Sequence, residues 1–180
     1  LCIINTCSVT QKAEQKARRI IRLVLKKYQN ASVIVTGCYA QLRPEEIKKM
    51  DKRISVLKGQ LKSRLTQIPE MLEGFLKGEK WNAEKFSDLL DINLFCLPQE
   101  KTDTPENSFL LATDSFIAHS RSSLKIQDGC NNNCSYCTIH MARGNSVSLN
   151  VQSVIARVKA LETKGMAEVV FTTVNIAHYR

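Results

Sequence analysis

Residues 32–38 read SVIVTGC, a short run of β-branched and apolar residues that ends at a glycine and a cysteine. Runs of this kind are typical of buried strands, because branched side chains pack well on a pleated surface. Two similar runs, LCIIN at residues 1–5 and ISVL at residues 54–57, lie before and after it in the sequence. The sequence therefore predicts three short, buried strands.

A helical pattern joins the first two strands, from about Thr10 to Tyr28, with Ser8 or Thr10 as its N-cap. Its apolar face consists of Ala13, Ala17, Ile20, Ile21, Val24, Leu25 and Tyr28. Its basic face contains one acid, Glu14, and consists otherwise of Lys12, Lys16, Arg18, Arg19, Arg22, Lys26 and Lys27. A solvated surface is the ordinary interpretation of such a face, and contact with nucleic acid is the alternative.

Further helices are expected after Pro44 and over residues 61–77, where Pro69 marks a break or a new start. The apolar stripe of the second of these helices consists of Leu61, Leu65, Ile68, Leu72 and Leu76. Strands that alternate with helices are the pattern of a parallel α/β sheet. We therefore expect residues 1–77 to form one α/β domain.

Residues 78–121 differ from this pattern. The stretch 78–108 contains Gly78, Pro98, Pro105 and a polar run, which predict a linker with little structure. The apolar pieces within residues 109–118 are compatible with a connecting hairpin. This segment is expected to join two domains.

The α/β pattern resumes in residues 122–180. A short strand over residues 124–126 leads into a loop rich in cysteine. A helix is expected from Val151 to Lys164, with Gly165 ending it, and a further strand follows over residues 168–172. The inward face of this helix is expected to hold Val154, Ile155, Val158 and Leu161.

The composition narrows the class of protein. The chain has 180 residues, 43% of them hydrophobic, and a formal net charge of +9. That positive charge suits a polyanionic partner such as RNA or DNA, or an ordinary solvated surface. No apolar run suggests a membrane span, and no signal peptide opens the chain. Seven cysteines without an export signal indicate a reduced, cytoplasmic protein that uses thiolates as metal ligands.

Three of these cysteines, Cys130, Cys134 and Cys137, have the spacing C-x3-C-x2-C. Thiolates are soft ligands that suit iron–sulfur clusters or zinc. Three thiolates in eight residues can hold one face of a cubane cluster and leave one iron without a protein ligand. A zinc site with His140 as the fourth ligand is the alternative, and buried free thiols are a third interpretation.

The surrounding sequence, KIQDGCN at residues 125–131, CSYCTI at 134–139 and ARG at 142–144, resembles the radical S-adenosylmethionine (SAM) methylthiotransferases. The resemblance implies that Cys130, Cys134 and Cys137 hold a [4Fe-4S] cluster whose open iron binds SAM. It also implies reductive cleavage of SAM to methionine and a deoxyadenosyl radical. Tyr136 is then expected to form a wall of the SAM site.

Asn175, near the end of the second strand of this part, is expected either to help bind SAM or to be a turn residue. Arg143 is expected to hold an anionic group or to pair with an acid. This sequence departs from the family pattern at His140, where proline is usual, and at Thr173 and Ala177, where glycine is usual.

The resemblance extends upstream to INTCSVT at residues 4–10 and TGCYAQ at residues 36–41. It implies that Cys7 and Cys38 are two of the three ligands of an auxiliary [4Fe-4S] cluster that helps to supply the sulfur. The family's other ligand precedes residue 1. Cys2 is expected to be a core residue, and Cys96 matches nothing in the family.

Within the family, residues 125–131 look most like the bacterial enzymes that methylthiolate C2 of threonylcarbamoyladenosine at position 37 of tRNA. The sister branches act on isopentenyl-adenosine in tRNA or on an aspartate of a ribosomal protein. The implied partners are tRNA and an electron donor, with no membrane and no stable protein partner. A zinc-stabilised nucleic-acid-binding module without catalysis is the alternative of another class.

The implied fold is an α/β methylthiotransferase domain over residues 1–77, a connecting segment over 78–121, and the start of a partial (β/α) radical SAM barrel over 122–180. Two barrel strands are visible in the sequence, whereas such a barrel needs about six. We therefore expect roughly the first half of such an enzyme, without its opening segment.

Overall fold

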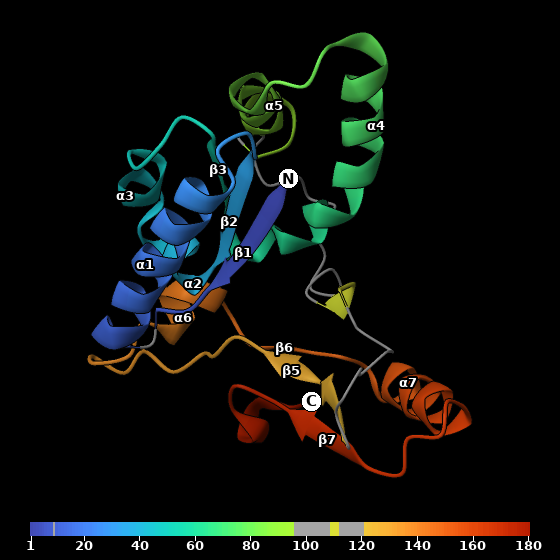
Figure 1. Ribbon diagram of the computed structural model, residues 1–180. Helices are drawn as coiled ribbons and strands as arrows, with labels where there is room; N and C mark the ends of the chain where they lie inside the picture. The colour runs from blue at the N-terminus through green and yellow to red at the C-terminus, as the bar shows by residue number, and fades with distance from the viewer. Residues whose placement is uncertain (9, 96–108, 112–120) are drawn as a thin grey trace. The chain divides into compact units, whose positions relative to one another are not determined.

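The computed structural model describes residues 1–8, 10–95, 109–111 and 121–180, and Figure 1 shows their course. The chain divides into two compact units, Leu1–Thr102 and Asp103–Arg180. No helix in the described ranges is both long and apolar enough to cross a membrane.

The first unit is built on a parallel sheet of three strands, β1 (Cys2–Thr6), β2 (Val33–Gly37) and β3 (Ile54–Lys58), in the order β1-β2-β3. The register pairs Thr6 with Gly37 and Gly37 with Lys58, so the three strands end together. The predicted parallel α/β sheet is therefore confirmed.

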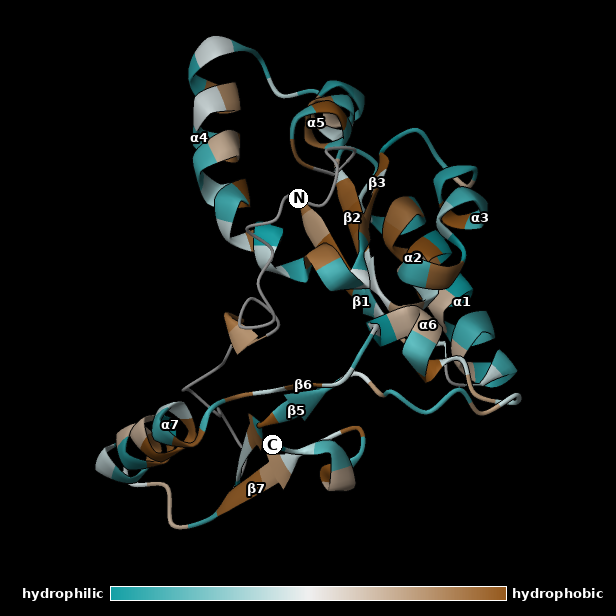
Figure 2. Ribbon diagram, turned by 180° about the vertical axis from the view of Figure 1, so that it is seen from behind, coloured by the Kyte–Doolittle hydropathy of each residue, from teal (hydrophilic) through white to brown (hydrophobic). Residues whose placement is uncertain are grey.

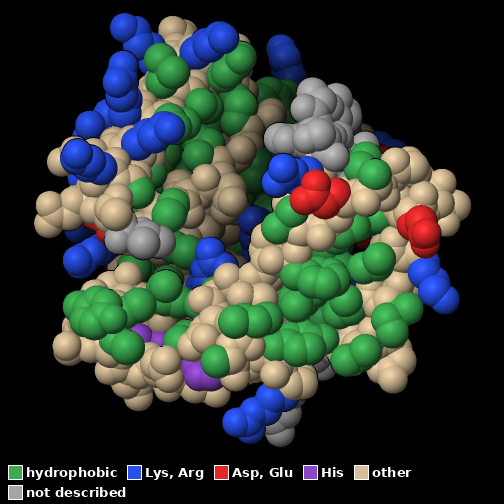
Figure 3. All heavy atoms as spheres, turned by 90° about the horizontal axis from the view of Figure 1, so that it is seen from below, with side chains coloured by type: hydrophobic (Ala, Val, Ile, Leu, Met, Phe, Trp, Pro, Cys, Tyr) green, Lys and Arg blue, Asp and Glu red, His purple; other side chains and the backbone are tan. Residues whose placement is uncertain are grey.

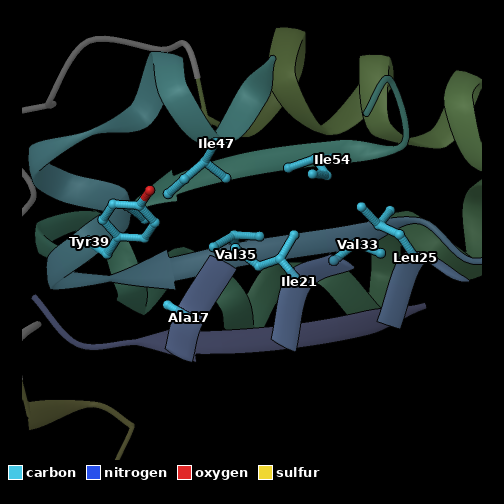
Figure 4. Close-up of a cluster of buried hydrophobic side chains, with 9 residues drawn as sticks. Ala17, Ile21, Leu25, Val33, Val35, Tyr39, Ile47 and Ile54 are labelled. Atoms are coloured by element: carbon cyan, nitrogen blue, oxygen red, sulfur yellow. The ribbon is translucent and has the colours of Figure 1, made fainter. Parts of the chain in front are cut away.

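One face of this sheet is covered by α1 (Gln11–Lys27), α2 (Cys38–Leu42) and α3 (Pro44–Lys48) (Figure 1). The predicted cap of α1 is confirmed, because the Thr10 side chain accepts a hydrogen bond from the Ala13 N–H. The core on this face, shown in Figure 4, consists of Ala17, Ile21, Leu25, Val33, Val35, Tyr39, Ala40, Ile47 and Ile54. Cys2 packs against this core, as expected of a core residue.

The other face carries η1 (Gly59–Gln67), α4 (Ile68–Gly78), α5 (Ala83–Leu90) and η2 (Asp91–Phe95). Side chains alternate across a strand, so Ile34 lies on this face while Val33 and Val35 lie on the other. Figure 2 shows β2 and β3 coloured hydrophobic along most of their length, as expected of strands buried on both faces.

The predicted new helix start at Pro69 is confirmed, because η1 ends at Gln67 and Pro69 lies in the first turn of α4. Two other expectations for this region were wrong. The change of winding exposes Leu76 (53%) and buries Phe75 instead. The stretch from residue 78 is not without structure, because Asn82 caps α5 and Phe86 and Leu90 are fully buried.

The second unit contains two small sheets. Strand β4 (Ser122–Lys125) pairs in parallel with β7 (Val169–Thr172), and β5 (Gln127–Asp128) pairs antiparallel with β6 (Val147–Ser148). The helices are α6 (Ile139–Arg143), α7 (Val151–Thr163) and η4 (Ile176–His178). This is the expected strand–helix–strand order.

The details of the second unit differ from expectation at two places. Leu161 of α7 is buried, but Ile155 is 49% exposed and does not face inward. Residues 109–111 form no strand, and the rest of the predicted hairpin lies outside the described residues. Phe109 is buried, and its ring contacts the Lys125 ammonium at 5.3 Å from the ring centre.

Candidate metal centre

The cysteine loop lies between β5 and α6. It carries Cys130, Cys134 and Cys137, all half-buried. The Cys130 N–H donates to the Gly144 carbonyl at 3.1 Å, and the Cys137 N–H donates to the Cys134 carbonyl at 3.0 Å. The loop is thus closed at its base and turns back on itself before α6 begins.

Gly129 makes this closure possible. Its φ is +72°, a left-handed conformation that glycine adopts without steric cost. A Cβ atom at this position would lie 2.0 Å from the Asn145 carbonyl oxygen. The two arms of the loop therefore approach each other more closely than any side chain would allow.

Gln127 holds the loop from beneath and is fully buried. Its Nε2 lies 2.9 Å from the Asp128 carbonyl, 2.8 Å from the Gly129 carbonyl and 2.9 Å from Ser146 Oγ. Its Oε1 accepts hydrogen bonds from the N–H groups of Val174 and Asn175 at 2.9 and 3.0 Å. One side chain thus joins the cysteine loop to the segment that follows β7.

Asp128 forms two ion pairs at the start of the cysteine loop. Its carboxylate lies 2.7 Å from Lys125 Nζ and 2.9 Å from an Arg143 guanidinium nitrogen, and it accepts from the Gly129 N–H at 2.9 Å. Burial opposes its ionisation, but the hydrogen bonds and charges of Lys125 and Arg143 outweigh burial and lower its pKa. Arg143 therefore pairs with an acid, one of its two expected roles.

Gln127 and Asp128 were not among the site residues predicted from the sequence. The signal for Gln127 was a polar residue next to the apolar Leu124 and Ile126 in a short strand, which demands buried hydrogen-bond partners. The signal for Asp128 was an acid three residues after Lys125 and directly before a glycine. Neither signal identifies a partner that lies far along the chain.

The three thiols share one loop but do not converge. Among the described residues no three His, Cys, Asp or Glu side chains lie close enough together to hold a metal ion. Cys130, Cys134 and Cys137 are free thiols that keep some access to solvent. The donor set fits an iron–sulfur cluster, because three soft ligands leave one iron for an external ligand.

Cys7 and Cys38 follow neighbouring strands at one edge of the first sheet. Cys7 comes directly after Thr6 and Cys38 directly after Gly37, and these two residues are paired in the register of β1 and β2. Cys7 is exposed and Cys38 is half-buried. Ligands from parallel strands are expected at this carboxyl-end edge. Cys96 lies outside the described residues.

Tyr136 and Asn175 have different surroundings. The Tyr136 side chain is 88% exposed and forms no wall in this structure. Asn175 is the N-cap of η4, where its side chain accepts from the Ala177 N–H at 3.2 Å, as expected of a turn residue. The departures from the family pattern lie nearby, with Thr173 half-buried and Ala177 exposed.

The histidines do not pair with the cysteines. The Nδ1 atoms of His140 and His178 are buried and have no hydrogen-bond partner among the described residues. These two ring nitrogens are therefore unsatisfied in the described part of the structure. His119 lies outside the described residues.

Comparison with protein-family models gives two matches. Residues 1–59 match a family described as uncharacterized protein family UPF0004, and residues 124–180 match the radical SAM superfamily. The first match covers the three-stranded sheet and the helices of one face, α1, α2 and α3. The second match begins in β4 and contains the cysteine loop.

Comparison with curated proteins gives relatives that align with nearly the whole chain. The threonylcarbamoyladenosine tRNA methylthiotransferase MtaB of Treponema pallidum is 39% identical over 100% of this chain and 46% of its own length. MtaB of Chlamydia pneumoniae is 31% identical over 99% of this chain and 35% of its own. The ribosomal protein uS12 methylthiotransferase RimO of Desulforamulus reducens is 31% identical over 98% of this chain and 37% of its own length.

The chain thus spans less than half the length of these relatives. The two family models fall on its two compact units, in the same order as the domains implied by the resemblance. The chain is therefore similar to the radical SAM methylthiotransferases over nearly its whole length, with a UPF0004 segment followed by a radical SAM segment.

Proposed function

We propose that the protein is a methylthiotransferase in which Cys130, Cys134 and Cys137 hold a [4Fe-4S] cluster with SAM at the open iron. The observation that carries the proposal is the loop itself, which presents three free, half-accessible thiols and belongs to the part that matches the radical SAM superfamily. When bound, the cluster supplies the electron that cleaves SAM.

The residues around the loop have positioning roles in this proposal. Gln127 and the Asp128 carboxylate with its two cations fix the start of the loop, and Gly129 allows its arms to approach. Tyr136 is free to close over a bound ligand, because its ring is 88% exposed. The Asn175 N–H donates to Gln127 Oε1, and this backbone link to the base of the loop supports a role for Asn175 in binding SAM.

We also propose an auxiliary cluster on Cys7 and Cys38. Their position at one edge of the parallel sheet supports this, since both follow paired residues of adjacent strands. Two thiolates are fewer than the three ligands that the family resemblance implies, so a further ligand is required. This cluster would take part in supplying the sulfur.

Threonylcarbamoyladenosine in tRNA is the proposed substrate. Two observations support this proposal: the activity for which the MtaB relatives are named, and the net charge of +9. The reaction would replace the hydrogen on C2 of the adenine with a methylthio group, and it needs an electron donor. A tRNA substrate makes the cytoplasm the proposed location.

The test is analysis of tRNA from cells that lack the gene and carry either the wild-type protein or Cys134→Ala. We expect the methylthio derivative of threonylcarbamoyladenosine with the wild type and the unmethylthiolated nucleoside with the variant. Absence of the methylthio nucleoside from wild-type cells, with the protein present and its iron bound, would contradict the proposal.

A ribosomal-protein substrate is the second candidate, favoured by the 31% identity with a protein named for that activity. The masses of intact ribosomal proteins from the same cells separate the two candidates. A methylthio group on a ribosomal protein and none on tRNA would move the assignment to this branch. Zinc in place of iron in anaerobically purified protein would instead favour a non-catalytic binding module.

A further inference from the structure

The net charge of the chain is concentrated on α1. This helix holds seven basic residues and one acid, which amounts to +6 of the chain's +9. Six of the basic residues lie on the surface, namely Lys12, Lys16, Arg19, Arg22, Lys26 and Lys27. Figure 3 shows Lys and Arg side chains gathered at the upper left of the view, where α1 lies, with few acids among them.

None of these six cations forms an ion pair within the described part of the chain. The two acids near this helix, Glu14 and Glu46, both pair with Arg18, which is only partly exposed and also donates to the Tyr39 hydroxyl at 3.0 Å. The acids nearby are thus engaged on the side of the helix that faces α2 and α3. All the charged side chains exposed on the outer face of α1 are therefore cations.

This arrangement costs the helix stability. Lys12 and Lys16, and Arg22 and Lys26, are like charges four residues apart, and each such pair destabilises a helix. Lys12 also lies in the first turn, where the helix dipole disfavours cations. A helix face that only needs to be solvated gains nothing from such a pattern, because alternating charges serve as well.

We propose that the outer basic face of α1, defined as the six exposed cations above, binds the phosphate backbone of RNA. The stretch from Lys12 to Lys26 extends about 21 Å along the helix axis. Cations recur along it every three or four residues, or every 5–6 Å or so, which allows contacts to several successive phosphates. The absence of interspersed acids and the uniform sign favour a polyphosphate over a protein surface of mixed charge.

The inference rests on the proposed function for the identity of the RNA, which is the tRNA substrate. It goes beyond that function by assigning substrate docking to the first unit, away from the cysteine loop in the sequence. The helix face then contributes to substrate affinity and has no role in the chemical step. Its removal is expected to raise KM for tRNA and to leave kcat unchanged.

The experiment compares two quadruple variants of the full-length holoprotein. One carries Lys12→Gln, Lys16→Gln, Arg19→Gln and Lys26→Gln. The control carries Lys49→Gln, Lys52→Gln, Lys77→Gln and Lys80→Gln, four exposed lysines outside α1 that form no ion pair in the described residues. Both variants lose the same charge, so a difference between them reports position.

The measurement is the Kd for an unmodified tRNA transcript across a series of salt concentrations. We expect the α1 variant to bind tRNA about 10- to 100-fold more weakly near 0.1 M salt. The negative slope of log association constant against log salt concentration should become smaller in magnitude by about three. The control is expected to change less than about 3-fold. The thermal midpoint of the α1 variant should equal or exceed that of the wild type, because like-charge pairs are relieved.

Equal Kd values for the α1 variant and the wild type would overturn the inference, and so would equal losses in both variants. Polyglutamate serves as a second, acidic-protein ligand in the same assay. If the α1 variant lost binding to polyglutamate but kept its affinity for tRNA, the inference would be overturned and the face would be assigned to an acidic protein. The proposed function is judged separately by the methylthio product. A wild type that binds tRNA through α1 but forms no product would leave the inference standing and refute the function.

Discussion

Replacement of Gly129 by alanine tests whether the cysteine loop is held as closely as the structure indicates. The left-handed conformation costs a non-glycine residue about 1–2 kcal/mol. The new Cβ atom would also lie 2.0 Å from the Asn145 carbonyl oxygen and 2.8 Å from the Gly144 carbonyl oxygen, both backbone atoms. Separating these arms costs about 1–3 kcal/mol for the overpacking and about 1 kcal/mol for the Cys130–Gly144 hydrogen bond.

Gly165 provides the matched control. Its φ is +82°, close to that of Gly129, but a Cβ atom there meets nothing within 4 Å. Gly165→Ala should therefore cost only the conformational term of about 1–2 kcal/mol, and Gly129→Ala should cost about 2–4 kcal/mol more.

Hydrogen exchange in the loop and iron content after anaerobic reconstitution are the assays. Faster exchange at the Cys130 amide and loss of iron are expected for Gly129→Ala alone. Equal effects of the two substitutions would refute the close approach of the two arms.

Three further perturbations test other parts of the structure. Ile21→Ala, in the core between α1 and the sheet, should lower the free energy of unfolding by about 2–4 kcal/mol in urea titrations, whereas Leu23→Ala, at a side chain 61% exposed, should lower it by less than about 0.5 kcal/mol. Gln127→Leu should speed hydrogen exchange at the two amides after β7 that it accepts from, and exchange unchanged from the wild type would rule out its bridging role. The hydrogen bond from Arg53 lowers the pKa of Asp51 below its ordinary value of 3.8, so this stabilisation is full above that pH and is lost as the pH falls below it. Asp51→Asn removes this ionisation, so the free energy of unfolding should fall less steeply as the pH is lowered below 3.8. An unchanged pH dependence would contradict the Asp51–Arg53 pair.

The elements that could be predicted from the sequence are those whose signals are local. Thr10 and the apolar repeat of Ala17, Ile21 and Leu25 define α1 within a residue or so of its observed ends. The branched run of β2 defines a strand buried on both faces. The carboxyl ends of β1 and β2 place Cys7 and Cys38 at one edge, because parallel strands share their direction.

The wrong predictions concern residues whose burial is decided by tertiary contacts. Pro69 was recognised as a break, but which side chains become buried after it depends on the aromatic cluster of Phe75, Trp81 and Phe86, whose rings lie 5.3–6.0 Å apart. Phe75 belongs to α4, Trp81 to the connection after Gly78, and Phe86 to α5. Composition at Gly78 suggested a linker, whereas packing continues through α5.

In the candidate site, too, the local pattern predicts the ligands but not the contacts that hold them. The spacing of Cys130, Cys134 and Cys137 indicates a ligand set, yet the loop that presents them depends on contacts with Gly144, Ser146 and the segment after β7. Gln127 makes the longest of these connections, across 48 residues to Asn175. No local pattern encodes a partner at that distance.

The central claim is that the loop of Cys130, Cys134 and Cys137 holds a four-iron cluster whose open iron binds SAM. The most direct test is the electron paramagnetic resonance spectrum of the dithionite-reduced, anaerobically purified full-length protein, recorded with and without SAM. We expect the signal of a reduced four-iron cluster that shifts on addition of SAM, and we expect Cys134→Ala to abolish that shift. A cluster signal that ignores SAM, or iron-free protein that is folded and loaded with zinc, would contradict the claim.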